Sequence, residues 1–196
     1  MVLKRINRYL KEYFGIGIFR DDLLRGALRF GVRYFNNKPV DVVEIGTYKG
    51  INAKQILKNL NVRSLYAIDP WNNYSEYNEY NNESLKKVYD SAMKLLKKEV
   101  KSGKVIVVRD YSENAYNILK NKKFDFIYID GNHDYNYVKK DIFSFWSLLK
   151  DGGILGGHDI DFTGVLQAVS EFSAKSKLKL NAQSKDWWII KDKNKD

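Results

Sequence analysis

Four residues with side chains suited to acid–base or metal chemistry lie just after two apolar segments of the chain. Asp130 and His133 follow the first segment. His158 and Asp159 follow the second, and the chain has no other histidine. If both segments are parallel strands, their carboxyl ends meet at one edge of a sheet, where open α/β folds bind ligands. A carboxylate beside an imidazole can bind a metal or transfer a proton, although either histidine could be an ordinary surface residue.

A glycine-containing turn earlier in the chain is typical of a nucleotide-binding edge. Residues 43–50 read VEIGTYKG. Glycine lets the chain turn tightly after a buried strand and approach a ligand closely, with the N-terminus of the next helix facing that ligand. Two glycines are fewer than the complete dinucleotide-binding pattern contains, so a simple tight turn is an alternative interpretation.

A third polar position, Asp69, ends the segment SLYAID and precedes Pro70. It lies roughly 20 residues after Gly46, and an acid at about that distance accepts hydrogen bonds from ribose hydroxyls in this kind of fold. Because Asp-Pro also starts turns, Asp69 could cap a turn instead. Taken with the glycine turn, the position favours ribose binding.

The segments that would carry these residues alternate between strand and helix patterns. Strand-like segments fall at residues 40–45, 64–69, 104–108, 124–130 and 152–157. Helix-like segments fall at residues 52–60, 83–100, 113–120, 137–150 and 165–172. This alternation predicts parallel strands joined by crossover helices. Two further strands, at 178–180 and 187–190, are expected to form a closing antiparallel hairpin.

Helical patterns also precede the sheet and define the expected domain organisation. Apolar residues at helical spacing predict a basic amphipathic helix within 3–14 and a second helix over 23–37. We therefore expect an N-terminal helical cap at 1–37, one α/β domain at 38–191 and a disordered tail at 192–196.

The composition excludes several classes of protein. Without cysteine, the chain has neither disulfides nor a cysteine nucleophile. No apolar run approaches the roughly 18 residues of a membrane span, and the charged N-terminus is unlike a signal peptide, so we expect a cytoplasmic protein. The formal net charge is +10. A nucleic-acid partner is possible but not favoured, because the lysines are scattered along the chain.

Over about residues 40–191 the chain resembles the class I S-adenosylmethionine (SAM)-dependent methyltransferases, in particular the small O-methyltransferases related to catechol and macrolide-sugar O-methyltransferases. Residues 43–52 are similar to the first motif of that family. Its scaffold stretch is matched by Trp146, Leu148, Leu149, Gly152 and Gly153. The resemblance implies an α/β, Rossmann-like fold with a seven-stranded, mostly parallel sheet, a C-terminal antiparallel hairpin, helices on both faces and an N-terminal helical cap.

The resemblance also implies which residues bind SAM. Glu44 falls where the family meets the methionine amino end of SAM, and Asp69 falls where it holds the ribose. The segment 110–112 falls where it contacts the adenine. Besides Glu44 and Asp69, the implied cofactor-binding residues are Gly46, Tyr48, Gly50, Asp110, Tyr111, Ser112 and Asp130.

A metal site and a base are implied in the same way. Asp130, His158 and Asp159 fall on the three metal-ligand positions of the family, which would suit Mg²⁺ or Mn²⁺. The catechol-type enzymes have a carboxylate where this chain has His158. His133 falls where relatives carry the general base, so His133 and Asp130 are the expected catalytic residues.

The predicted function is O-methylation of a hydroxylated small molecule or sugar by SAM. The N-terminal helices and the tyrosine-rich segment 71–80 are expected to select the acceptor, and the same helices are the expected contact of a homodimer. Two alternatives stay open. One is methylation of RNA, and the other is a SAM-binding protein without catalysis.

Overall fold

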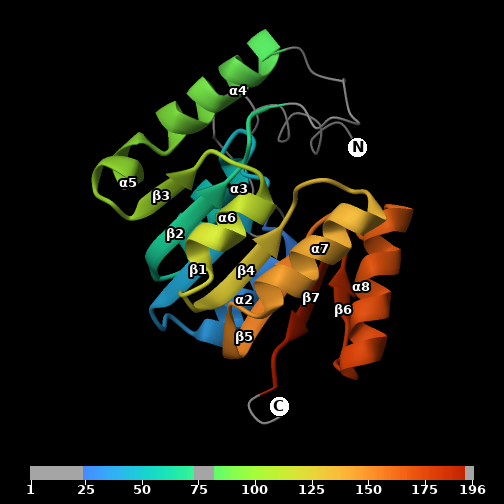
Figure 1. Cartoon of the computed structure of the whole chain (residues 1–196). Coiled ribbons are helices and arrows are strands. Elements are labelled where there is room, and N and C mark those ends of the chain that lie inside the picture. The colour runs from blue at the N-terminus through green and yellow to red at the C-terminus, as the bar shows by residue number, and fades with distance from the viewer. Residues whose placement is uncertain (1–23, 73–81, 193–196) are drawn as a thin grey trace, which may run out of the picture.

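A seven-stranded sheet forms the centre of the computed structural model, which describes residues 24–72 and 82–192 (Figure 1). The strands are β1 (Val40–Ile45), β2 (Val62–Ile68), β3 (Val105–Val108), β4 (Phe124–Ile129), β5 (Leu149–Gly157), β6 (Asn181–Gln183) and β7 (Asp186–Ile190). The helices are α2 (Gly26–Phe35), α3 (Ile51–Asn59), α4 (Asn82–Leu95), α5 (Lys97–Lys101), α6 (Ser112–Leu119), α7 (Tyr135–Trp146) and α8 (Thr163–Ser176).

The strands follow the order β3-β2-β1-β4-β5-β7-β6, and among these seven β7 runs opposite to the others. β1 pairs in parallel with β2 and β4, while β3 and β5 extend the parallel sheet on either side. β7 is antiparallel to both β5 and β6. The α/β fold with a C-terminal antiparallel hairpin is therefore confirmed. The neighbours β1 and β4 lead into diverging connections, and such a switch point is where open α/β sheets bind ligands.

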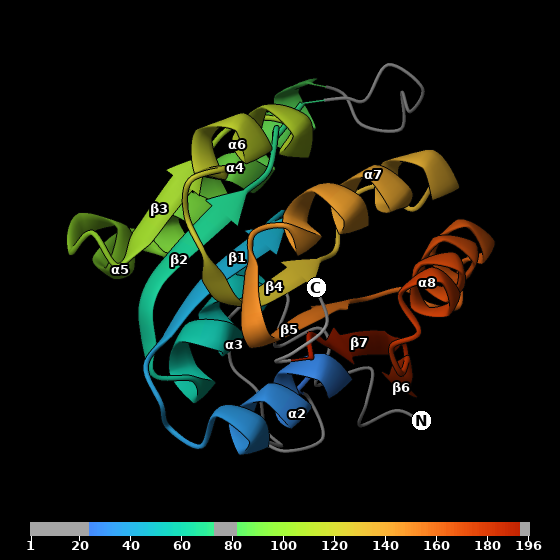
Figure 2. The same ribbon diagram turned by 60° about the horizontal axis from the view of Figure 1, so that its bottom comes forward.

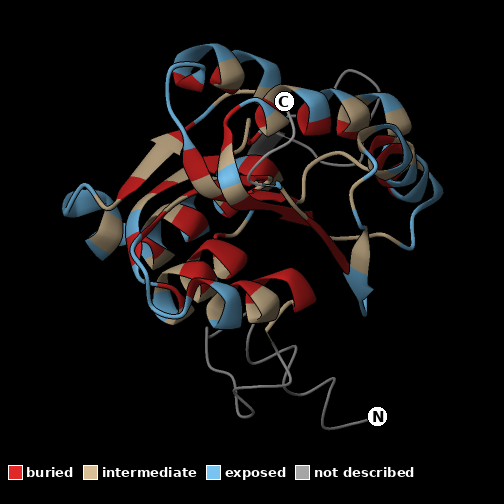
Figure 3. Cartoon of the chain, turned by 90° about the horizontal axis from the view of Figure 1, so that it is seen from below, coloured by how far each residue is buried: buried red, intermediate tan, exposed pale blue. Residues whose placement is uncertain are grey.

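Helices cover both faces of the sheet, as expected (Figure 2). On one face, Leu119 of α6, Phe145 of α7 and Phe172 of α8 pack into the core. On the other face, Leu28 of α2 and Ile56 of α3 do the same. The central strands are mostly buried, and the outward sides of the helices are exposed (Figure 3). Burial on both faces explains why the parallel strands read as nearly continuous apolar segments.

The segment 178–180 is not a strand, and that prediction was wrong. α8 is followed by Lys177, whose φ of 55° is left-handed, and the Leu178 amide then donates to the Ser173 carbonyl oxygen at 3.2 Å. This hydrogen bond and the left-handed Lys177 make the start of the segment part of the turn that ends the helix. The apolar side chains there, which suggested a strand, pack against the core instead. β6 begins only at Asn181.

Two other boundaries differ from the sequence pattern. The expected helix 83–100 is divided between α4 and α5, because the fully buried Leu96 has φ −97° and ψ 7°. The expected helix 137–150 ends early, since α7 stops at Trp146 and Leu149 already pairs with Phe124 of β4. In both places tertiary packing overrides a continuous helical pattern.

The part of the expected N-terminal cap that the structure describes is α2, which packs against β5, β6 and β7. The predicted helix within 3–14, the tyrosine-rich residues 73–80 and the tail 193–196 lie outside the described residues. Within residues 24–72 and 82–192, none of the helices combines the length and the apolar content that a membrane span requires.

Candidate active site

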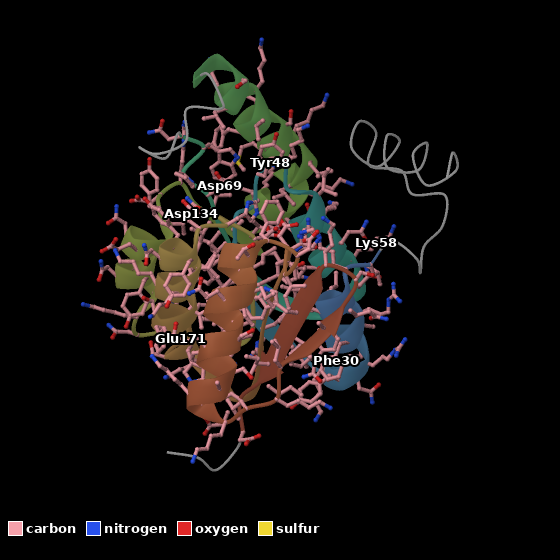
Figure 4. The ribbon with its side chains drawn as sticks, turned by 90° about the vertical axis from the view of Figure 1, so that its right-hand side faces the viewer. Phe30, Tyr48, Lys58, Asp69, Asp134 and Glu171 are labelled. Atoms are coloured by element: carbon pink, nitrogen blue, oxygen red, sulfur yellow. The ribbon has the colours of Figure 1, made fainter. Side chains whose placement is uncertain are left out.

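The carboxyl ends of β1, β2, β4 and β5 bring the predicted polar residues to one edge of the sheet. Tyr48, Asp69 and Asp134 lie toward the same end of the molecule (Figure 4). Three non-glycine residues in these loops have a left-handed backbone, with φ of 48° at Tyr48, 42° at Trp71 and 58° at Asp159. Such conformations cost free energy and cluster in functional loops.

The two glycines of the first turn are required by packing. Gly46 has a φ of 84°, and a side chain there would overlap the carbonyl oxygen of Asp130. Gly50 has a φ of 74° and directly precedes α3, where an added Cβ would lie 3.1 Å from the Leu96 side chain. Because both glycines are explained by the fold, the assignment of a ligand to this turn depends on Glu44.

Glu44 is a fully buried carboxyl group with one unsatisfied oxygen. Its Oε1 accepts a hydrogen bond from the Asn52 side chain at 2.9 Å. Its Oε2 is buried without a hydrogen-bond partner among the described residues, and so is the Thr47 hydroxyl. Burial raises the pKa of Glu44 to about 8, although Asn52 and the neighbouring Thr47 hydroxyl oppose the rise. An ammonium group placed here would satisfy both orphaned oxygens, so the residues fit the amino end of SAM.

Asp69 is held between the loops that follow β1 and β2. Its two carboxylate oxygens accept hydrogen bonds from the backbone amides of Tyr48 and Trp71, both at 2.7 Å. The Trp71 indole in turn donates to the Tyr48 carbonyl oxygen at 2.8 Å. Burial raises the pKa of Asp69, and the two amides oppose that shift. Each oxygen has a second lone pair, so the fixed carboxylate can still accept from ribose hydroxyls.

A cavity of about 450 Å³ lies next to Asp69, where the resemblance places the adenine. It is lined by Pro70, Trp71, Asn72, Arg109, Asp110 and Tyr111. Asp110 Oδ1 accepts from the Tyr111 amide and from the Asn114 side chain, both at 2.8 Å. Asp110 therefore fixes the start of α6 while lining this cavity.

Ser112 contributes to a different cavity, also of about 450 Å³, between α6 and α7. Its lining residues are Tyr111, Ser112, Glu113, Asn114, Tyr137, Lys140, Asp141 and Ser144. Ser112 hydrogen-bonds with the buried carboxyl of Asp141, whose pKa burial raises to about 7. The structure thus divides the three predicted adenine residues between two cavities.

Asp130 is paired with a residue that the sequence analysis did not identify. Arg25 Nη1 lies 2.5 Å from Oδ2 of Asp130 and donates to the Tyr128 hydroxyl at 3.1 Å. Burial raises the pKa of Asp130, and the positive charge of Arg25 opposes the rise. Burial would lower the pKa of Arg25, but its contacts with Tyr128 and Asp130 raise it overall. The guanidinium therefore stays charged beside the end of β4.

Asp159 joins the two histidines of the chain. Its Oδ2 lies 2.9 Å from His133 Nε2, and its Oδ1 lies 2.8 Å from His158 Nδ1. Although burial acts to raise it, donation by the two imidazoles holds the pKa of Asp159 well below its usual range. The hydrogen bond to Asp159 also raises the pKa of His133, against the effect of burial. The His133 ring stacks on Phe162, with centroids 4.6 Å apart.

The three expected ligands, Asp130, His158 and Asp159, are not arranged so that all three could bind one divalent ion. The groups whose ligand atoms converge within 4.8 Å are Asp130, His133 and Asp159, whereas His158 is not among them. His158 Nδ1 instead lies 3.7 Å from Asp130 Oδ1, and it binds Asp159 more closely. Asp130 Oδ2 faces Arg25, and the two oxygens of Asp159 face the two histidines, whereas Asp130 Oδ1 lies 3.7 Å from His158 Nδ1, beyond hydrogen-bond distance. A metal bound through Asp130 Oδ2 would have to displace Arg25.

Three residues of the site escaped the sequence analysis. Asn52 lies eight residues after Glu44, on the first turn of α3, so a helix placed there could have indicated the contact. Arg25 and Asp186 come from opposite ends of the chain, and no local pattern connects them with β4. The Tyr128 hydroxyl links them, because it accepts from Arg25 at 3.1 Å and donates to Asp186 at 3.0 Å.

The sequence matches the protein family described as "Methyltransferase domain" over residues 43–160, which is more than half of the chain. This range contains the turn after β1, Asp69 and both histidines. No curated protein sequence matches the chain.

Several solved structures share the fold. A Staphylococcus aureus protein assigned as a caffeoyl-CoA O-methyltransferase has a TM-score of 0.65 and 16% identity, with 95% of this chain and 91% of that chain covered. An O-methyltransferase from Bacillus cereus in complex with SAH has a TM-score of 0.62 and 15% identity, with 95% and 97% covered. A ribosomal protein L11 methylase from Lactobacillus delbrueckii subsp. bulgaricus has a TM-score of 0.55 and 15% identity, with 86% and 77% covered. At such identities the likeness establishes the fold alone, and the acceptors of these proteins differ.

Proposed function

The chain belongs to the methyltransferase-domain family, and on that premise we propose that it is a SAM-dependent O-methyltransferase acting on a hydroxylated small molecule or sugar. One observation carries the proposal. A buried carboxyl with an unsatisfied oxygen at Glu44 and a histidine–carboxylate pair at His133 and Asp159 stand at the same edge of the sheet. The first suits the amino end of SAM, and the second suits removal of a hydroxyl proton.

SAM, when bound, supplies a methyl group on a positively charged sulfur. Within the chain, Glu44 would accept hydrogen bonds from its ammonium group, and Asp69 would accept from its ribose. The cavity lined by Trp71 and Tyr111 would enclose the adenine. These contacts fix the direction in which the methyl group faces, and alignment of this kind provides a large part of the rate of a displacement reaction.

His133 is the proposed general base. Its Nε2 faces Asp159, which orients the ring and leaves Nδ1 to take the proton of the acceptor hydroxyl. SAM held by Glu44 and Asp69 would supply the methyl group to the acceptor oxygen, and His133 would hold the proton that this oxygen loses. The proton then resides on His133, and its positive charge is stabilised by the carboxylate of Asp159. Asp130 would lie beside the acceptor, held by Arg25.

No step of this reaction depends on the divalent metal implied by the resemblance, because its three expected ligands do not converge. A cytoplasmic location, a homodimer through the N-terminal helices and the cap as a separate domain stay predictions. Methylation of RNA and SAM binding without catalysis are the alternative functions.

The proposal is tested with radiolabelled SAM and three sets of acceptors: hydroxylated aromatic compounds, sugars and total RNA. We expect label in one of the two small-molecule sets, attached to oxygen. Label found only in RNA would favour the RNA alternative. If SAM binds tightly and no acceptor is labelled, the chain is a SAM-binding protein without catalysis.

A further inference from the structure

Arg25 forms an ion pair with Asp130 in the site. It directly precedes α2, and its guanidinium reaches Asp130 Oδ2 at 2.5 Å and the Tyr128 hydroxyl at 3.1 Å. The side chain is 28% exposed. The guanidinium carbon also lies 5.6 Å from the centre of the Tyr128 ring. An arginine held by a carboxylate and an aromatic ring has a defined position.

The start of α2 is fixed so that Arg25 must point into the site. The backbone amide of Ala27 donates to Asp186 Oδ2 at 2.9 Å, and the other oxygen of Asp186 accepts from Tyr128. At Gly26, an added Cβ would lie 2.8 Å from the carbonyl oxygen of Gln183, so the helix approaches the β6–β7 hairpin closely. The start of α2 is thus anchored to the β6–β7 hairpin directly after Arg25.

The two carboxylates at this edge face nitrogen groups of the chain itself. Asp130 and Asp159 provide two carboxylates, and Arg25, His133 and His158 provide the groups that face them. A divalent cation would add two positive charges beside the Arg25 guanidinium and would compete with it for the Asp130 carboxylate. Breaking this partly buried ion pair to admit it would leave the guanidinium without its counterion, which is unfavourable.

We propose that Arg25 takes the place of a divalent cation in this site: it holds Asp130 in position and supplies the positive charge beside the acceptor. This inference rests on the proposed function for its role in methyl transfer, but the exclusion of the metal by Arg25 can be measured without it. Arg25 acts through Asp130 and is therefore a positioning residue.

The test is a titration of the whole chain with Mn²⁺, followed by electron paramagnetic resonance of the free ion. The proteins are the wild type, Arg25→Met, Arg25→Lys and, as a matched control, Arg33→Met at an exposed position of the same helix. We expect weak binding by the wild type, Arg25→Lys and the control. Arg25→Met should bind Mn²⁺ at least about tenfold more tightly, because removal of the guanidinium frees Asp130. Adding Asp130→Asn to Arg25→Met should abolish that gain.

Tight Mn²⁺ binding by the wild type would overturn the proposal, and so would a folded Arg25→Met protein with no gain. Circular dichroism establishes folding. If Arg25→Met does not fold, the uncharged Arg25→Gln replaces it with the same expectation, and the wild-type result stands independently. A SAM titration of the same proteins distinguishes a failure of this proposal from a failure of the proposed function. A wild type that binds neither SAM nor Mn²⁺ would count against the methyltransferase proposal and leave the exclusion of the metal intact.

Discussion

The Nε2 atom of His133 lies 2.9 Å from Oδ2 of Asp159, and this contact joins the loop after β4 to the loop after β5. The sequence predicted two polar clusters, one at the end of each strand, and the two residues belong to different clusters. Their contact gives the histidine a fixed orientation and a carboxylate that stabilises its protonated form. A histidine held in this way has the properties of a general base.

Replacement of His133 by alanine should reduce kcat by about 10² to 10⁴-fold, the usual contribution of a positioned base, and leave SAM affinity nearly unchanged. His133→Gln, which keeps a hydrogen bond to Asp159, should be impaired to a similar extent because it cannot take a proton. Single-turnover rates and melting temperatures of both variants are the measurements. A lower melting temperature with an unchanged rate would mean that His133 only stabilises the loop.

The pH dependence of kcat should also report the protonation of His133. The hydrogen bond that His133 donates to Asp159 raises the pKa of His133, so the base is protonated, and inactive, up to a higher pH than an isolated histidine. Activity should therefore fall on acidification through a pKa above the ordinary value of about 6.5. In Asp159→Asn the acidic limb should move to lower pH. An acidic limb that stays in place in this variant would exclude His133 as the titrating group.

SAM binding should release a proton from Glu44. In the free protein, burial raises the pKa of this carboxyl to about 8, so it is mostly protonated at pH 7, and a bound ammonium group favours its ionised form. Below the raised pKa, SAM affinity should therefore increase with pH, by up to about tenfold per pH unit. Calorimetry at pH 6.5 in buffers of different ionisation enthalpy measures the released proton. Glu44→Gln should release none, and a wild type without release would refute the assigned contact.

Gly164→Ala should damage the site through the backbone. An added Cβ at Gly164, in the first turn of α8, would overlap the His133 carbonyl oxygen and approach the Tyr135 amide. We expect a loss of about 1 to 3 kcal/mol in the free energy of unfolding and a lower kcat, because the loop that carries His133 must move. The control is Gly31→Ala in α2, where the nearest atom would be 3.5 Å away. That variant should be neutral or more stable by up to about 1 kcal/mol. Equal stabilities of the two variants would contradict this account.

The positions of Asp69 and Asp130 could be predicted because each follows an apolar strand, and parallel strands align their carboxyl ends at one edge. The contact of His133 with Asp159 could not be predicted, because it depends on how two loops curve beyond the sheet. The left-handed φ of 58° at Asp159 is one such detail. Its carboxylate contacts both histidines, whereas the expected metal site required His158 to converge with Asp130.

Arg25 and the segment 178–180 show two other limits of sequence patterns. Arg25 reaches the site only because α2 packs across the sheet onto β7, a contact between opposite ends of the chain. The leucines within 178–180 are apolar because they cover the core beside α8, and an alternating pattern does not distinguish this from a strand.

The central claim is that this edge of the sheet binds SAM, and calorimetric titration of SAM into the wild type and Asp69→Ala tests it most directly. The wild type should bind one SAM per chain. The variant loses an acceptor that the Tyr48 and Trp71 amides hold in place, and its binding should weaken by about 1.5 to 3 kcal/mol, the range for a charged hydrogen bond. Asp151→Ala, at an exposed residue near the start of β5, is the matched control and should bind as the wild type does. Absence of SAM binding by the wild type, or equal affinity in Asp69→Ala, would contradict the account.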